Sequence, residues 1–234
     1  IVPVYNMSSS LARSVDSPLN QSFADFEAIL VDDGSTDGSG AVCDTYAAKD
    51  ARIKVIHKAN GGVGAARNDA LAVASGTWVT FVDADDIVMP NWLATFSKGF
   101  ESGADIIVQG YVRVETDGTR SVYEGRELLC GRSEAALTLI EDPLKGVVWN
   151  KAFSLKLLKE AGVLYDPTVR PGQDDLFTSE YLPHIDKACF VKGAEYVYHV
   201  PDWNAKYSRD WAVMFPVKAK IYSLYRRSAG AWDE

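Results

Sequence analysis

Carboxylates gather in two short runs of this sequence, and their type and spacing suit the binding of a divalent cation. The first run is Asp32-Asp33-Gly34-Ser35 and the second is Asp83-Ala84-Asp85-Asp86, while Asn6 is a further polar residue near the start. Neighbouring carboxylates repel one another unless a cation or hydrogen-bond donors share their site. Hard oxygen ligands suit Mg²⁺ or Mn²⁺, which proteins hold through one or two carboxylates and substrate phosphates. The sequence therefore predicts a site for a divalent metal and a phosphate-bearing ligand.

Each polar run directly follows a short apolar segment that is typical of a strand. We expect strands at residues 1–5, 26–31, 53–56 and 78–82, and helices at residues 8–19, 36–49, 63–74 and 90–101. Strands that alternate with helices of this length indicate βαβ units and a parallel sheet. Ligands of such sheets bind at the carboxyl ends of the strands, so we expect the polar runs to meet at one edge.

The pattern changes after residue 104 to that of a mixed α+β region. We expect a long strand at 105–114, a hairpin return at 120–123, helices at 133–141, 154–161 and 174–182, a strand at 190–199, and a helix at 209–227 interrupted or bent at Pro216. The predicted fold class is therefore α/β. Residues 1–104 and 105–205 form the two halves of one domain, and residues 206–234 form an amphipathic helical tail.

The composition fits one large globular domain. The 234 residues are 47% hydrophobic, which supplies a core, and their net charge of −8 argues against a dedicated nucleic-acid binder. The three cysteines are far apart and have no zinc-binding spacing, so we expect no disulfide framework. The sequence contains no apolar run of about 18 residues and no visible signal peptide. A reducing, cytoplasmic location fits these features best.

Other interpretations of the motifs were weighed. The first carboxylate run also suits a simple turn with a helix cap, and it partly imitates a calcium-binding loop through Asp33, Ser35, Asp37, Gly38 and Asp44. The imitation ends in Asp rather than Glu, and a strand instead of a helix precedes it, so a calcium loop is disfavoured.

A glycine-rich turn, Asn60-Gly61-Gly62, precedes the alanine-rich helix at 63–74. The dinucleotide-binding pattern is not met, because Arg67 stands where its last glycine is required. Such a turn still offers backbone N–H groups to an anion, and Arg67 adds a cation one turn into the helix. A tight turn with a packing face of small residues is the structural alternative, and both interpretations can hold together.

Six motifs follow one another in a characteristic order. They are Val2-Pro3-Val4-Tyr5-Asn6, Val31-Asp32-Asp33-Gly34-Ser35-Thr36-Asp37, Asn60-Gly61-Gly62 with Ala65-Ala66-Arg67-Asn68, Phe81-Val82-Asp83-Ala84-Asp85-Asp86, Trp149-Asn150-Lys151, and Gly172-Gln173-Asp174-Asp175-Leu176-Phe177. In order and spacing they resemble the signatures of the family 2 glycosyltransferases, which are inverting enzymes of the GT-A fold. The resemblance covers residues 1–200 and implies a Rossmann-like, mostly parallel sheet flanked by helices.

The resemblance implies that residues 1–104 bind a nucleotide-sugar donor. The base pocket would be lined by Pro3, Tyr5, Asp32 and Asp33, with Asp33 hydrogen bonding the base imide of a UDP donor. The ribose, diphosphate or donor sugar would be approached by Asn60, Gly61 and Arg67.

The run Asp83-Ala84-Asp85 resembles the family's metal-binding DxD motif. Asp85 would bind Mn²⁺ or Mg²⁺ directly, while Asp83 would touch ribose or sugar hydroxyls beside the metal. Asp86 would assist this site or cap the next helix. His199 would complete the metal shell, or be structural.

The resemblance also implies that residues 105–205 bind the acceptor, through Trp149, Asn150, Lys151 and Gln173. Trp149 would form a wall of the acceptor or donor-sugar site, or it would be a core residue. Asp174 matches the position of the family's general base, which takes the acceptor proton. The family usually has Glu where this chain has Gln173, and Asp175 restores a carboxylate one position later. Asp175 is therefore an alternative base, although adjacent helical residues point about 100° apart and cannot easily exchange roles.

These roles predict an inverting transfer of a sugar from a nucleotide-sugar, favoured as a UDP-sugar, to a saccharide or lipid-linked acceptor in cell-surface polysaccharide synthesis. One alternative is a degenerate transferase that retains the nucleotide pocket as a binding module. Another is a nucleotidyltransferase that makes the sugar nucleotide itself.

The tail has its own charge. Residues 206–227 contain six basic residues and one acidic residue among aromatic and aliphatic side chains. Such a helix suits peripheral contact with an anionic membrane surface on the cytoplasmic side. It equally suits packing on the domain or on another subunit in a homodimer.

Overall fold

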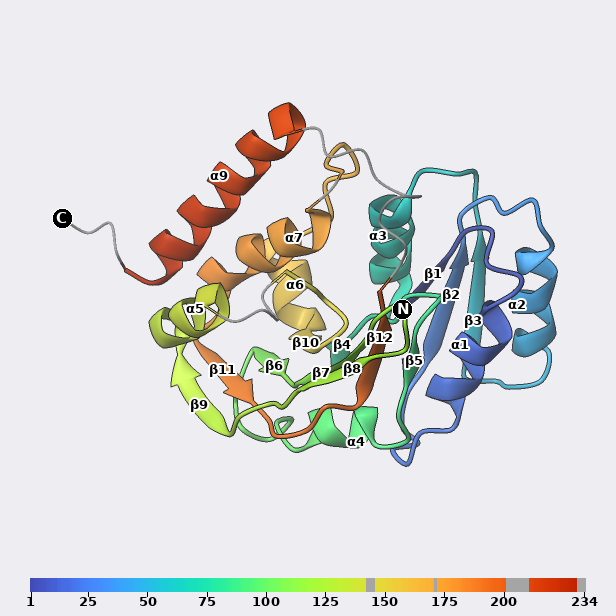
Figure 1. Cartoon of the computed structure of the whole chain (residues 1–234), viewed down its shortest axis with the longest axis horizontal. Coiled ribbons are helices and arrows are strands. Elements are labelled where there is room, and N and C mark those ends of the chain that lie inside the picture. The colour runs from blue at the N-terminus through green and yellow to red at the C-terminus, as the bar shows by residue number, and fades with distance from the viewer. Residues whose placement is uncertain (142–145, 171, 201–210, 231–234) are drawn as a thin grey trace.

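The first half of the chain forms a parallel sheet between helices. The computed structural model describes residues 1–141, 146–170, 172–200 and 211–230. The sheet has the order β1-β2-β3 and all five residues of its central strand are buried. Its elements are β1 (Val2–Val4), α1 (Leu11–Leu19), β2 (Ala28–Asp32), α2 (Ser39–Ala47), β3 (Ile53–His57) and α3 (Val63–Val73). Figure 1 shows α3 on one side of this sheet and α1 and α2 on the other, so the predicted βαβ organisation is confirmed.

The segment before the second carboxylate run joins this sheet to another. The Ile1 nitrogen donates to the Thr80 carbonyl at 2.9 Å, and the Val82 N–H donates to the Ile1 carbonyl at 2.9 Å. Residues 80–82 therefore run beside β1, and Asp83 follows them at the sheet edge that also carries Asp33.

A five-stranded mixed sheet continues from this junction in the order β4-β10-β6-β11-β9. Its strands are β4 (Trp78–Val79), β6 (Ile106–Val108), β9 (Leu128–Gly131), β10 (Lys151–Ser154) and β11 (Lys187–Phe190). Only β6 and β11 pair in parallel; β10 is antiparallel to both of its neighbours, and β9 is antiparallel to β11. The mixed character expected after residue 104 is confirmed.

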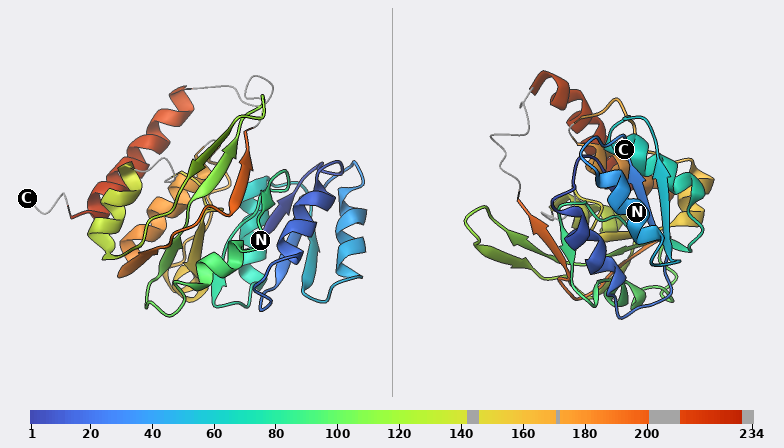
Figure 2. Two further views of the ribbon diagram at one scale, coloured as in Figure 1. Left: turned by 60° about the horizontal axis from the view of Figure 1, so that its bottom comes forward. Right: turned by 90° about the vertical axis from the view of Figure 1, so that its right-hand side faces the viewer.

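Two strands predicted as continuous are each divided between sheets. The expected strand at 105–114 is interrupted at Gln109-Gly110, and the expected strand at 190–199 is interrupted before Tyr196. The later pieces belong to a third sheet of order β5-β12-β7-β8, made of β5 (Ile87–Val88), β7 (Tyr111–Val114), β8 (Arg120–Tyr123) and β12 (Tyr196–His199). A Cβ on Gly110 would lie 2.0 Å from the Tyr123 carbonyl oxygen, so this crossing requires glycine. Figure 2 shows the β7–β8 hairpin and β12 extending from the body of the molecule.

The remaining helices lie within a few residues of the predicted positions. They are α4 (Trp92–Ser97), α5 (Arg132–Glu141), α6 (Leu155–Ala161), α7 (Gln173–Tyr181), the short 3₁₀ helix η1 (Leu182–His184) and α9 (Trp211–Ser228). Ser154 caps α6 by accepting a hydrogen bond from the Leu157 N–H. Gly162 then ends the helix in the left-handed conformation that favours glycine.

An aromatic cluster connects the two halves of the chain below the predicted site. Phe81 makes edge contacts with Phe153, Tyr165 and Phe177, at ring-centroid separations of 6.1, 5.8 and 6.0 Å. All four rings are buried. Because Phe177 belongs to α7 and Phe81 follows β4, this packing fixes the start of α7 relative to the end of β4.

The tail helix packs on the domain with one face. Ile221 and Tyr225 of α9 are buried, and the helix contacts α5 and α7. Phe215 and Tyr222 are exposed at 75% and 50%. The helix continues through Pro216, so an interruption there is wrong, while a bend at Pro216 stays a prediction. Among the described helices, none is long and apolar enough to cross a bilayer.

Candidate active site

Asp33 organises the glycine turn. It follows β2, and its carboxylate accepts hydrogen bonds from the Gly61 N–H at 2.8 Å and the Gly62 N–H at 2.7 Å. The Lys58 ammonium donates to the same carboxylate at 3.1 Å, and Asp33 is 2% exposed. These two N–H groups were candidates for binding a ligand anion, and in this structure both donate hydrogen bonds to the Asp33 carboxylate instead. The roles of Asp33 and Gly61 toward a donor stay predictions.

Asp32 belongs to a second chain of contacts, which includes a histidine that sequence reasoning left without a role. The Asp32 carboxylate accepts a hydrogen bond from the Ser35 N–H at 3.0 Å and lies 3.0 Å from Nδ1 of His57. The other ring nitrogen of His57 lies 2.9 Å from Asp44. Hydrogen bonding to Asp44 and Asp32 raises the pKa of His57. The histidine therefore connects the Asp32 loop to Asp44 of α2.

Pro3 and Tyr5 lie at the carboxyl end of β1, beside these loops. Pro3 is half-buried in the strand, while Tyr5 is 47% exposed. Asn6 adopts a positive φ of 53°, and its amide oxygen accepts a hydrogen bond from the Thr36 N–H at 2.8 Å. Asn60 donates to the Asp33 carbonyl at 3.0 Å. The predicted base-side residues thus gather at one sheet edge.

Arg67 connects the two carboxylates that were assigned to opposite substrates. It lies on α3, is 2% exposed, and donates to Asp83 at 2.9 Å and to Asp174 at 2.5 Å. Its guanidinium also lies over the rings of Phe81 and Tyr165, at 5.5 and 5.1 Å from their centroids. Burial lowers the pKa of Arg67, but the two carboxylates raise this pKa by more than burial lowers it. The side chain therefore stays charged.

Asp174 and Asp175 start α7 but face different partners. Burial raises the pKa of the Asp174 carboxyl, and the charge of Arg67 opposes this effect. The carboxylate of Asp175 instead accepts a hydrogen bond from the Tyr225 hydroxyl of α9 at 3.3 Å. The two carboxylates thus have different neighbours, and the choice of Asp174 rather than Asp175 as the base stays a prediction.

The second carboxylate run is tied to β12. Asp86 is 1% exposed and accepts hydrogen bonds from the Tyr196 hydroxyl at 2.9 Å and the His199 N–H at 2.8 Å. The Tyr196 hydroxyl also accepts a hydrogen bond from the Asp83 N–H at 3.1 Å. Asp86 therefore holds the motif to β12 and does not cap α4, whose N-cap residue is Asn91. Burial raises the pKa of Asp86 to about 8.

These residues fit a cation that shares its ligands with a substrate. Within the described ranges, no three His, Cys, Asp or Glu side chains form a metal cage. A Mg²⁺ or Mn²⁺ ion bound through one or two carboxylates and diphosphate oxygens needs no such cage. Asp85 is half-buried, and the buried Nδ1 of His199 has no hydrogen-bond partner among the described residues, although it lies 3.6 Å from the Asp86 carboxylate. Asp85, His199 and Asp83 thus supply a suitable partial set.

The predicted acceptor residues at 149–151 are buried. Trp149 is 2% exposed and stacks on Tyr196 at 4.2 Å, while Asn150 and Lys151 are fully buried. Asn150 donates to the Gln109 carbonyl at 3.1 Å and accepts from the Lys151 ammonium at 2.9 Å. Together these side chains hold the crossing between sheets. Their role toward an acceptor stays a prediction.

Gln173 also turns inward. Its side-chain amide donates to the Val169 carbonyl, and its oxygen lies 2.8 Å from where a Cβ on Gly64 would stand. The side chain is 8% exposed. An ionised Glu could not donate to this carbonyl, so the amide suits the observed packing.

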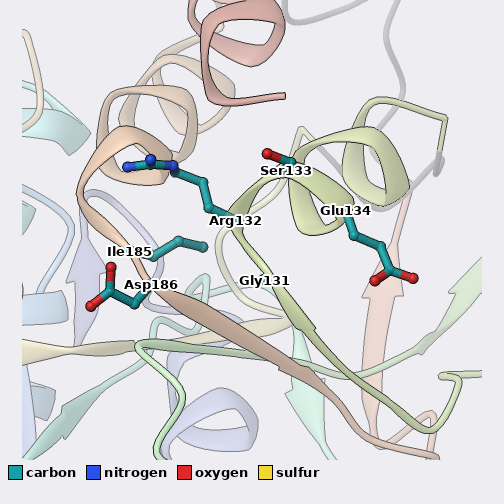
Figure 3. A pocket seen from close by; sticks show the side chains of 6 residues that line it. All are labelled: Gly131, Arg132, Ser133, Glu134, Ile185 and Asp186. Carbon is teal, nitrogen blue, oxygen red and sulfur yellow. The ribbon is translucent and has the colours of Figure 1, made fainter. Parts of the chain in front are cut away.

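A hollow of about 440 Å³ lies elsewhere, where β9 meets α5. Figure 3 shows its lining: Gly131, Arg132, Ser133, Glu134, Ile185 and Asp186. None of the predicted site residues contributes to it, and Arg132 donates to the Pro183 carbonyl at 2.7 Å.

The fold and the carboxylate-rich sheet edge define an α/β protein of the GT-A class. Crystal structures of Staphylococcus aureus TarS 1–349 share the fold: the complex with UDP has a TM-score of 0.75 at 24% identity, covering 96% of this chain and 64% of that one. The mannosyltransferase PcManGT of Pyrobaculum calidifontis, solved with GDP-Man and Mn²⁺, has a TM-score of 0.65 at 17% identity, covering 100% of this chain and 64% of that one.

The family is more specific than the class. The model of glycosyl transferase family 2 matches residues 1–161, and this chain belongs to that family. The uncharacterized glycosyltransferase EpsJ of Bacillus subtilis is 32% identical over 206 residues, which are 85% of this chain and 59% of EpsJ. The poly(ribitol-phosphate) beta-glucosyltransferase of Bacillus spizizenii is 29% identical over 86% of this chain and 32% of its own length. The chain thus spans less than two thirds of these relatives.

Proposed function

We propose that this chain is the catalytic domain of an inverting glycosyltransferase that moves a sugar from a UDP-sugar to an acceptor hydroxyl. The observation that carries the proposal is the Arg67 guanidinium, which holds both Asp83 and Asp174. It joins a donor-side carboxylate at the sheet edge to a candidate base at the start of α7. The fold shared with TarS, which was solved with UDP and with UDP-GlcNAc, supports a uridine donor.

Asp174 is the proposed general base. As the acceptor oxygen attacks the anomeric carbon and the bond to the UDP oxygen breaks, Asp174 takes the acceptor proton. Attack on the face opposite the leaving group inverts the anomeric configuration. The raised pKa of this carboxyl strengthens it as a base, and general-base help is worth about 10²- to 10⁴-fold in rate.

Asp85 and His199 are the proposed protein ligands of Mn²⁺ or Mg²⁺, with Asp83 beside them. The cation would stabilise the negative charge that builds on the leaving diphosphate. Pro3, Tyr5, Asp32 and Asp33 would form the base pocket, and the exposed ring of Tyr5 offers a surface for stacking.

The proposed acceptor is a saccharide or a lipid-linked saccharide of a cell-surface polymer. The naming of one relative as a poly(ribitol-phosphate) glucosyltransferase supports a polymeric acceptor. Residues 105–205 would receive it near Trp149 and Gln173. The exposed aromatic residues Phe215 and Tyr222 on a basic helix suit peripheral attachment to the cytoplasmic membrane face, with a homodimer contact as the alternative.

The first test is thermal stability with UDP, GDP, CDP and TDP, each with and without Mn²⁺. A ligand at about 100 times its dissociation constant adds about 2.7 kcal/mol, or about 5–10 °C for a domain of this size. A shift with UDP that requires Mn²⁺ is expected. A shift with a different nucleotide would change the donor, and no shift with any of them would contradict the proposed function.

A further inference from the structure

Arg170 lies on the glycine turn, although no motif pointed to it. Its Nη2 donates to the Gly61 carbonyl at 3.2 Å. A Cβ built on Gly62 would stand 1.5 Å from the same nitrogen, so the guanidinium rests directly against the Gly62 backbone. Gly62 also has a φ of 87°, which side-chain-bearing residues rarely adopt. The turn thus leaves room for this cation by having no side chain.

The charge of Arg170 is not neutralised by a carboxylate as the charges of Arg67 and Lys58 are, and the exposed Arg13, which donates to the Asp85 carbonyl at 3.2 Å, is a further cation at this edge. Arg67 is bound to two carboxylates, and Lys58 lies 3.1 Å from Asp33 and 3.5 Å from Asp69. Among the described residues, no carboxylate lies within ion-pair distance of Arg170, which is exposed to solvent. The Gly61 carbonyl holds the Arg170 guanidinium in position but does not neutralise its charge. Arg170 is therefore a positioned positive charge that an anion can approach.

The location of Arg170 indicates which anion it would bind. The Gly61 and Gly62 N–H groups are engaged by Asp33, so the turn's own donors do not face a ligand. Arg170 belongs to the segment that leads into α7 and its Asp174, and α3 and α7 lie next to each other in Figure 1. Arg170 therefore links the segment before the candidate base to the donor-side turn, and Gly61 of that turn is a residue that the sequence assigns to the ribose, diphosphate or donor sugar.

We infer that Arg170 binds the diphosphate of the donor and stabilises it as it leaves, an inference that rests on the proposed function. A guanidinium presents five N–H donors in a planar fork that matches phosphate oxygens, and only one of them is needed for Gly61. Arg170 would then stabilise the negative charge that develops on the leaving diphosphate, in addition to any bound cation.

The test compares Arg170→Gln with the wild type by calorimetric binding of uridine, UMP and UDP in the presence of Mn²⁺. The affinity gained from UMP to UDP should fall about 10- to 100-fold, as expected for a charge-assisted hydrogen bond, while uridine binding stays unchanged. Arg170→Lys should keep part of the gain, because it keeps the charge but not the fork. Arg227→Gln, an exposed arginine at the end of α9, is the matched control and should bind as the wild type does.

Gly62→Ala provides a second route to the same result. Its Cβ would displace the guanidinium, so the UMP-to-UDP gain should fall as in Arg170→Gln, and the double variant should show no further loss. A far-ultraviolet spectrum and a melting curve without ligand check that this variant is folded. An unchanged UMP-to-UDP gain in Arg170→Gln, or an equal loss for uridine and UDP, would overturn the inference alone. A wild type that binds no nucleoside diphosphate would overturn the proposed function with it.

Discussion

The guanidinium of Arg67 donates to the carboxylate of Asp174 at 2.5 Å, although 107 positions separate the two residues in the chain. The other end of the same guanidinium holds Asp83 at 2.9 Å. A charge with 2% exposure is tolerated in a protein only when partners of opposite charge surround it. Arg67 is thus both a structural ion-pair centre and the element that orients the candidate base.

Replacing Arg67 by Met should damage stability and activity together. The change leaves two partly buried carboxylates without their cation, which typically costs about 3–5 kcal/mol when one member of a buried pair is removed. Urea unfolding measures the loss of unfolding free energy. Arg52→Met is the matched control: Arg52 pairs with Asp50 at 2.7 Å but its side chain is 34% exposed, so a loss of about 1 kcal/mol or less is expected. Equal losses in the two variants would contradict the ion-pair assignment.

Asp174→Asn should abolish most transfer while leaving donor binding intact. The amide cannot take the acceptor proton, so the rate of sugar transfer should fall about 10²- to 10⁴-fold. The UDP dissociation constant should change little, which calorimetry can check. Asp175→Asn is the control, because Asp175 faces Tyr225 of α9 and should retain most of the rate. If Asp175→Asn is the inactive variant instead, the base has been assigned to the wrong residue.

Tyr196→Phe should destabilise the carboxylate motif. Tyr196 is fully buried and its hydroxyl bridges Asp86 and the Asp83 N–H, so its removal leaves the buried Asp86 carboxylate and the partly buried Asp83 N–H without this partner. A loss of about 1–3 kcal/mol in unfolding free energy is expected. Tyr198→Phe removes a hydroxyl on the same strand outside this bridge and should cost less. A neutral Tyr196→Phe would show that the bridge adds nothing to stability.

The His57 contacts predict a pH-dependent part of the stability. Asp44 and Asp32 raise the pKa of His57 in the folded state, so the protonated ring stabilises the fold. This contribution is fully present below the unfolded pKa of about 6.5 and is lost as the pH rises through the higher folded pKa. The difference in unfolding free energy between the wild type and His57→Gln should therefore be largest below about pH 6.5 and shrink as the pH rises through the folded pKa of His57. A difference that is constant or grows with pH would refute the assignment.

The sequence alone was sufficient to predict the βαβ organisation of the first half and the sheet edge at which the polar runs meet. The strand Ala28–Asp32 is apolar up to its last residue because helices cover both faces of the sheet, and the parallel arrangement brings the carboxyl ends of such strands together. The order of the motifs was also enough to indicate the family that the comparisons establish.

Tertiary contacts decided the rest. Only Gln109-Gly110 separates the apolar residues 106–108 from residues 111–114, and the packing of Gly110 against the Tyr123 carbonyl reveals that two strands meet there. Trp149 looked suited to a sugar, yet three tyrosine rings enclose it. No local pattern links Arg67 to Asp174 or Arg170 to Gly61. Sequence periodicity reports which face of an element is buried, whereas the partner of a buried charge depends on which distant element packs against it.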